Sequence, residues 1–294
     1  MAIVEFKGKS LEKLVDVVSK GIGTLYKPRK IRNEADAEAY RSEVLAKAEA
    51  TKMLIENDAN LEILERTKNR IIHQEVSRQI NIEEVVEKSI PHLQENTTDG
   101  EIDEDWRTKF FQKAQDISNN DIQEVWAKIL ANEVSKPGEI SIRTMEVLSN
   151  LNKLEASRFQ NLCSLVSNNN NIWKLKNKNA LDEYNFTFND LILLRDAGLI
   201  YSSDTLVSII KIIPQFKAGF INIGNSMYLI IDKKNNKQEF RFEQLTLTVA
   251  GKELCKVLDI EKNETYFKEF INEKVKEGYE ITIIPNSITK QSIQ

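Results

Sequence analysis

The sequence predicts a mainly α-helical protein with a long N-terminal helix, a compact helical bundle and a C-terminal α+β module that is winged-helix-like. Residues 33–89 contain neither proline nor glycine and are rich in helix-forming residues, which favours long helix. Apolar side chains then recur every three or four residues from 103 to 165, and strand-like runs appear only after the asparagines 168–171. We therefore expect five parts: an amphipathic helix with a basic cluster (1–32), a long helix or helices (33–93), a helical bundle (101–166), an α+β module (172–285) and a disordered tail (286–294).

Residues 1–32 combine an amphipathic helix with a basic cluster. Gly21 and Gly23 each weaken an isolated helix by roughly 1 kcal/mol relative to alanine, so this helix needs a partner surface. That surface is either the rest of the protein or a second subunit, while an apolar face beside a basic cluster also suits the surface of the inner membrane. The predicted membrane or oligomer face comprises Leu11, Leu14, Val15, Val18, Ile22 and Leu25, and the basic cluster comprises Lys27, Arg29, Lys30 and Arg32.

Residues 33–93 are expected to form one long helix or two. Large apolar residues recur at seven- and three-residue steps, as the core positions of a coiled coil do, although Asn57 and Lys68 interrupt the pattern. Because such a helix cannot bury its apolar stripe alone, we predict that it pairs with copies of itself; folding back as a hairpin is the alternative. The predicted self-association seam comprises Leu54, Leu61, Leu64 and Ile71.

Residues 101–166 are predicted to form a bundle of four short helices. Asp103 is suited to cap the first helix and Ser141 the third, because their side-chain oxygens can accept hydrogen bonds from a first helical turn. Trp106, Phe110 and Trp126 offer a core in which each aromatic contributes on the order of 2–3 kcal/mol on full burial. The polar run 94–100 just before the bundle is predicted to be a linker.

The same region carries a resemblance to known proteins. The motifs are Asp105-Trp106, Phe110-Phe111, the runs 123–133 (QEVWAKILANE), 136–138 (KPG) and 141–144 (SIRT), and, upstream, 78–83 (RQINIE) and 25–28 (LYKP). With these motifs, over roughly residues 10–165, the chain resembles a bacterial family of unknown function that is similar to the abortive-infection alpha (Abi-alpha) proteins, a group linked to phage resistance. The resemblance implies a role in defence and brings no catalytic residues.

The C-terminal module is predicted to combine helices with strands. Asn189 is expected to cap a short helix that Gly198 ends, and Thr248 to begin another. The order helix, Gly-Leu-Ile, strands and Leu-Thr-x-x-x-Gly-x-x-Leu resembles winged-helix modules. The predicted strands are 206–213, 220–223, 227–231, 239–247 and 280–284, followed or preceded by helices at 191–196 and 266–276.

Few residues point to a ligand or to catalysis. A basic and aromatic patch made of Trp173, Lys174, Lys176 and Lys178 could meet nucleic-acid phosphates, which is a less favoured alternative. His73 and His92 are the only histidines, and neither has a cysteine or a second histidine at metal-ligand spacing. The acids at 103–105 suit a helix N-terminus, and Asp232 with Lys234 lacks a partner acid for nuclease chemistry. We expect no cofactor and no metal.

Composition and charge narrow the function further. A net charge of −4 argues against wholesale binding to nucleic acid. Cys163 and Cys255 lie among apolar neighbours and are expected to be buried free thiols in a reducing cytoplasm. No apolar run reaches about 18 residues and no secretory signal is evident, so we expect the cytoplasm, with the inner-membrane surface as an alternative. The expected function is a non-enzymatic homo-oligomeric interaction protein in anti-phage defence, with a phage or host protein as a further partner. The alternatives are a peripheral effector that perturbs the membrane through the N-terminal amphipathic helix, and a protein that binds nucleic acid through the C-terminal module.

Overall fold

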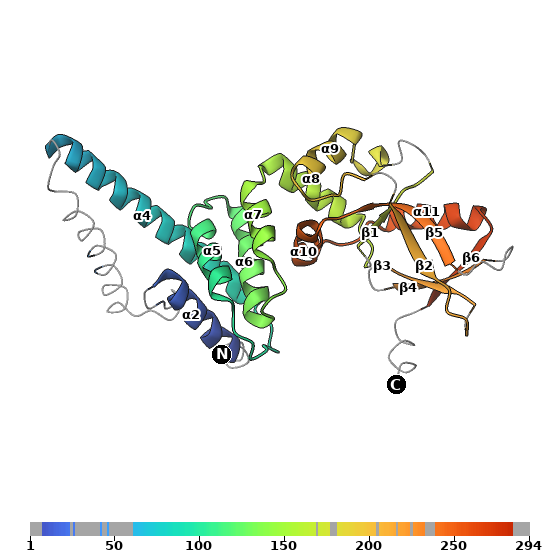
Figure 1. Ribbon diagram of the computed structural model, residues 1–294, viewed down its shortest axis with the longest axis horizontal. Coiled ribbons are helices and arrows are strands. Elements are labelled where there is room, and N and C mark those ends of the chain that lie inside the picture. Colours follow the sequence, from blue (N-terminus) through green and yellow to red (C-terminus); the bar gives the residue numbers. More distant parts are fainter. Residues whose placement is uncertain are drawn as a thin grey trace. The chain divides into compact units, whose positions relative to one another are not determined.

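The chain forms two compact units, Met1–Met145 and Glu146–Gln294, in the computed structural model (Figure 1). The residues that the structure describes are 8–23, 26, 42, 46, 61–168, 170–176, 181–203, 206–215, 217–223, 226–232 and 239–284. Over these residues the chain is mainly α-helical with two small three-stranded sheets. The predicted class, mainly α with some β structure, is therefore confirmed. The predicted tail 286–294 lies outside the described residues.

The first unit is built from helices around an aromatic core. The rings of Trp106 and Phe110 stack with centroids 5.1 Å apart, and Trp126 meets Phe110 edge to face at 5.2 Å. The indole nitrogen of Trp106 donates to the carbonyl of Ile140 at 2.8 Å, so its polar atom is satisfied within the core. The described elements are α2 (Gly8–Ile22), α4 (Leu61–Ser89), the 3-10 turn η2 (Ile90–His92), α5 (Glu104–Ala114), α6 (Asn120–Ser135) and α7 (Ile142–Asn150), within which the boundary between the units falls.

Two predicted helix caps are present in this unit. The carboxylate of Asp103 accepts from the backbone N–H of Trp106 at 2.8 Å at the start of α5. The hydroxyl of Ser141 accepts from the backbone N–H of Thr144 at 3.3 Å at the start of α7. Local hydrogen-bonding chemistry thus sets where these helices begin.

Helix α4 is one helix of 29 residues, about 43 Å long at 1.5 Å per residue. Ile82, Val85 and Val86 in its C-terminal half are buried, and the helix packs on α5 and α6. Its N-terminal half projects beyond α5 and α6 (Figure 1). A long helix is therefore present within the predicted range 33–93, from Leu61 onward.

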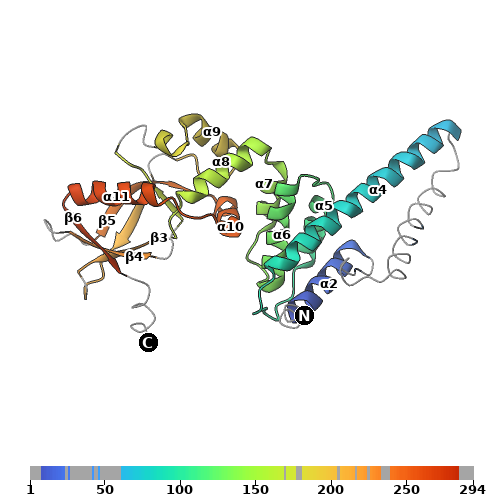
Figure 2. The same ribbon diagram turned by 180° about the vertical axis from the view of Figure 1, so that it is seen from behind.

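The second unit combines helices with two antiparallel sheets, ordered β1-β5-β2 and β3-β4-β6. Helix α11 packs along β6 (Figure 2). The elements are α8 (Lys153–Ser164), β1 (Asn171–Trp173), η3 (Asp182–Tyr184), α9 (Phe188–Asp196), β2 (Val207–Lys211), β3 (Gly219–Ile223), β4 (Ser226–Asp232), β5 (Glu239–Thr246), α10 (Val249–Leu258), α11 (Glu264–Lys276) and β6 (Tyr279–Ile284).

Most elements of the second unit lie where the sequence predicted them, with a few differences. Thr248 caps α10 as predicted, but α9 is capped by Thr187 rather than Asn189, because Thr187 and Asp190 form a capping box. Helix α8 packs with α9 and α10 instead of completing a bundle at 101–166, and the division between units falls at Met145. Strand β1 was not among the predicted strands.

Candidate interaction site

The apolar face of α2 is buried within the first unit. Leu14 and Val18 have no exposed surface and Val17 is 4% exposed, because α2 packs against α5 and α6. Leu11, Val15 and Ile22 are half-buried. Of the three surfaces considered for this helix, the rest of the protein covers Leu14, Val17 and Val18 here. Leu25 and the basic cluster Lys27, Arg29, Lys30 and Arg32 lie outside the described residues.

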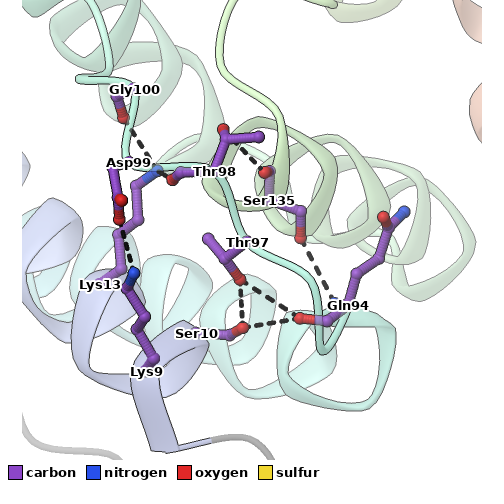
Figure 3. Close-up of polar contacts among 9 residues, drawn as sticks. All are labelled: Lys9, Ser10, Lys13, Gln94, Thr97, Thr98, Asp99, Gly100 and Ser135. Atoms are coloured by element: carbon purple, nitrogen blue, oxygen red, sulfur yellow. Dashed lines mark hydrogen bonds and ion pairs between the residues drawn. The ribbon is translucent and has the colours of Figure 1, made fainter.

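The polar run 94–100, here called the strap, fixes α2 to the first unit (Figure 3). Ser10 of α2 donates to the carbonyl of Gln94 at 2.6 Å and its hydroxyl also hydrogen-bonds that of Thr97. Lys13 donates to the carbonyls of Thr98 at 3.0 Å and Gly100 at 2.9 Å. The predicted linker is therefore a bonded part of the unit.

The other side of the strap is bonded to the C-terminal end of α6. The backbone N–H of Thr98 donates to the carbonyl of Ser135 at 3.0 Å, and the Ser135 hydroxyl accepts from the backbone N–H of Gln94 at 3.3 Å (Figure 3). The strap thus lies between α2 and α6 and connects them. Lys9 adds an exposed ion pair with Asp99 at 2.5 Å, which contributes little because both groups are solvated.

A buried carboxyl group, that of Glu133 in α6, lies near Lys13. Its side chain is 1% exposed and accepts from the backbone N–H of Gly138 at 2.8 Å. Burial raises the pKa of Glu133, while the N–H groups of Gly138 and Ile140 and the charge of Lys13 oppose the rise. Burial also disfavours the charged form of Lys13, and for an amine this lowers the pKa. Each charge therefore partly compensates the desolvation of the other.

Helix α4 presents a second surface, an exposed apolar stripe. Val76 is 39% exposed and Ile80 is 48% exposed, and Ile72, four residues before Val76, is half-buried. These three residues, here called the α4 stripe, share one helix face because they are four residues apart. Nine residues, or two and a half turns, separate Val76 from the buried Val85. The α4 stripe therefore faces away from the packed side of the helix.

The α4 stripe is not the seam that the sequence predicted. Ile71 is half-buried and lies nine residues before Ile80, hence on the opposite side of the helix. The side chains of Leu61 and Leu64, and the whole of Leu54, lie outside the described residues. The apolar residues of this segment are visible in the sequence, but the stripe was not predicted. Its signal is the four-residue spacing from Ile72 to Ile80.

Comparison with known proteins places this architecture in a family. Residues 65–271 match the family described as "Protein of unknown function (DUF2806)". This match covers most of the chain, from within α4 to within α11. The chain belongs to the DUF2806 family. No curated protein and no solved structure matches. The matched region includes the α4 stripe and the strap but excludes α2, and the family description names no activity.

The predicted nucleic-acid patch of this DUF2806 protein is divided between core and surface. Trp173 is fully buried and stacks on Phe270 with centroids 4.4 Å apart, so its ring is not available to stack on a base. The backbone N–H of Lys174 donates to the carbonyl of Glu243 at 2.8 Å. The ammonium of Lys176 lies 3.3 Å from the carboxylate of Glu277. Lys178 lies outside the described residues.

The remaining polar candidates of this DUF2806 protein are separate from one another. His92 contacts the carboxylate of Glu124 at 2.6 Å, and His73 is exposed on α4. Among the described residues, no group of three or more His, Cys, Asp or Glu side chains could hold a metal ion. Within the same residues, no helix is both long and apolar enough to cross a membrane.

Proposed function

We propose that this DUF2806 protein is a non-enzymatic interaction protein that self-associates through the α4 stripe and acts in the cytoplasm in anti-phage defence. One observation carries the self-association: Val76 and Ile80 are exposed apolar side chains on a helix that projects from its own unit. The defence role rests on the resemblance to the Abi-alpha proteins. A phage or host protein would be the further partner of the assembly.

The energetics favour a second copy as the occupant of the α4 stripe. Full burial of one Val or Ile side chain contributes about 1.5–3 kcal/mol, and a symmetric contact counts each residue once per copy. The start of α4, residues 61–70, has three basic and two acidic residues, whereas its end, residues 83–89, has three acidic residues and one basic residue. An antiparallel pair centred on Val76 would bring these opposite charges together, which favours a two-fold contact.

The test is the solution mass of the full chain, measured by light scattering. We expect the parent to have a multiple of the monomer mass. Ile80→Glu should weaken association at least tenfold, because it places a charge within the apolar contact. Gln74→Glu is the matched control: Gln74 is exposed on α4 but off the α4 stripe, so this variant should keep the parental mass. A monomeric parent, or an unchanged mass for Ile80→Glu, contradicts self-association through α4.

The defence role is tested separately in phage-infected cells. Cells that express the parent should survive infection as a population better than cells with empty vector, and Ile80→Glu should lose that protection while Gln74→Glu keeps it. Equal survival of the strains with the parent, Ile80→Glu, Gln74→Glu and empty vector would contradict the defence role. Self-association would then be judged from the light-scattering result alone.

We further propose that the second unit is a winged-helix-like module. The support for this is that α9 is followed by a turn at Gly198, and that Ile200, just after the turn, forms a β-bridge with Leu247, just before α10. In this proposal the module presents a protein-binding surface, since the aromatic residue of the predicted nucleic-acid patch is buried. A salt-sensitive gel shift of the full chain with DNA or RNA would contradict that assignment.

A further inference from the structure

The two cysteines of the chain, far apart in sequence, meet in the second unit. Cys163 lies in the last turn of α8 and Cys255 lies within α10; these two helices pack together, and the two thiols are neighbours. Cys163 has no exposed surface and Cys255 is 6% exposed. A disulfide requires the two Cα atoms to lie within about 7 Å of each other, so neighbouring thiols on packed helices are candidates for one.

The backbone around the pair holds the two helices together. The segment after α10 returns to the end of α8, where the backbone N–H of Asn263 donates to the carbonyl of Ser164 at 2.9 Å. The ammonium of Lys262 donates to the carbonyl of Cys163 at 3.2 Å. These bonds hold the segment that follows α10 against the end of α8, so the backbone helps to keep the two cysteines near each other.

The two sulfur atoms are not equivalent. The neighbouring thiol of Cys163 lowers the pKa of Cys255, and the ammonium of Lys262 lowers it further, while burial opposes both. Burial instead raises the pKa of Cys163. Cys255 is also the more exposed of the two. The thiolate is the reactive form of a cysteine. Cys255 is therefore the sulfur that would react first with an oxidant, and Cys163 is the resolving thiol.

We infer that Cys163 and Cys255 form a two-thiol site that a peroxide oxidises to a disulfide joining α8 to α10. The Cys255 thiolate attacks one peroxide oxygen, the O–O bond breaks, and the leaving oxygen takes a proton as water; Cys255 becomes a sulfenic acid. The Cys163 sulfur then attacks the Cys255 sulfur. An S–S bond forms, the Cys163 thiol gives up its proton, and the sulfenic hydroxyl leaves as a second water. Two thiols and one hydrogen peroxide thus yield one disulfide and two waters.

The experiment treats the folded full chain with hydrogen peroxide and reads the intact mass and a non-reducing peptide map. We expect the loss of two hydrogen atoms per chain and a single cross-linked peptide pair that contains both cysteines, reversed by dithiothreitol. This readout needs no variant. Two unmodified thiols, a gain of oxygen atoms in place of the loss of hydrogen, or a disulfide between chains would overturn the inference.

Single serine variants test the roles of the two sulfur atoms. In Cys163→Ser the sulfenic acid at Cys255 has no resolving thiol, so a dimedone adduct should accumulate there. In Cys255→Ser the remaining Cys163 should give at least tenfold less adduct over the same time. Circular dichroism checks that each variant is folded, and urea-unfolded chains serve as the reference in which both thiols react alike. Equal labelling in both folded variants contradicts the asymmetric pair.

Discussion

Gly21 of α2 lies directly against the ring of Phe111 in α5. A Cβ atom added to Gly21 would stand 2.1 Å from Cδ2 of Phe111, well inside contact distance. Phe111 is 4% exposed and meets Phe110 edge to face, so its ring has little room to move. The glycine that weakens the isolated helix is therefore what lets α2 approach the core.

Gly21→Ala should detach or strain the docked helix α2. Overpacking of a filled core costs about 1–3 kcal/mol, which outweighs the gain in helix propensity of roughly 1 kcal/mol. The free energy of unfolding, measured by urea titration, should therefore fall. Gly8→Ala is the matched control, because nothing lies within 4 Å of a Cβ at Gly8 in the same helix. Equal free energies of unfolding for the two variants would show that the ring of Phe111 can move away from the added methyl group, and would contradict the prediction.

Lys13→Met should loosen the strap without touching the apolar face of α2. The variant loses the two bonds from Lys13 to the carbonyls of Thr98 and Gly100, which are partly solvated and together contribute about 1 kcal/mol. Hydrogen exchange should then speed up in α2 and at the backbone N–H of Thr98. Lys20→Met is the control, since Lys20 contacts the exposed Asp16 within its own helix. Unchanged exchange in Lys13→Met would contradict the role of the strap.

Local chemistry explains what the sequence predicted correctly. Asp103 and Thr248 begin their helices because a side-chain oxygen needs only the next turn of backbone to form a cap. The strands of the second unit were predicted for the same reason, since each is a short apolar or β-branched run between turn residues. The exception, Thr187 in place of Asn189, arose because either residue suits the position and only Thr187 gains the reciprocal bond from Asp190.

Tertiary contacts explain what the sequence did not predict. The strap resembled a linker because its bonds to Lys13 use backbone carbonyls, which any sequence has. Trp173 was grouped with surface lysines, whereas pairing of β1 with β5 places it in the core. Contact between Cys163 and Cys255 depends on how α8 packs against α10, and no spacing in the sequence reports that. The sequence thus identified individual residues of the candidate site but not the contacts between them.

Trp173→Ala should destabilise the second unit as a core substitution does. The ring stacks on Phe270 and meets Phe267 edge to face at 6.2 Å, so its loss should lower the free energy of unfolding by about 3–5 kcal/mol. Lys176→Ala is the control: its ammonium is exposed and forms one surface ion pair with Glu277, which contributes about 0–1 kcal/mol. A stable Trp173→Ala variant would contradict the burial of the indole.

Glu133 should give the first unit a pH-dependent stability. Because burial raises the pKa of Glu133 above its ordinary value of 4.5, the folded state binds this proton more tightly than the unfolded chain does. The free energy of unfolding should therefore fall as the pH rises from the ordinary value through the folded-state pKa, and should level off above it. Glu133→Gln keeps an oxygen that can accept from the Gly138 N–H and has no proton to lose, so it should lack this fall.

The measurement is a urea titration of both proteins at a series of pH values, read as the difference in free energy of unfolding between variant and parent. Subtraction removes the other titrating groups. The difference should shift in favour of Glu133→Gln as the pH rises and then become constant. The positive charge of Lys13 stabilises the ionised form of Glu133, whereas Glu139 repels it. In Lys13→Met, which keeps Glu133, the free energy of unfolding should therefore decrease more strongly as the pH rises. A difference independent of pH would show that Glu133 titrates alike in the folded and unfolded chains.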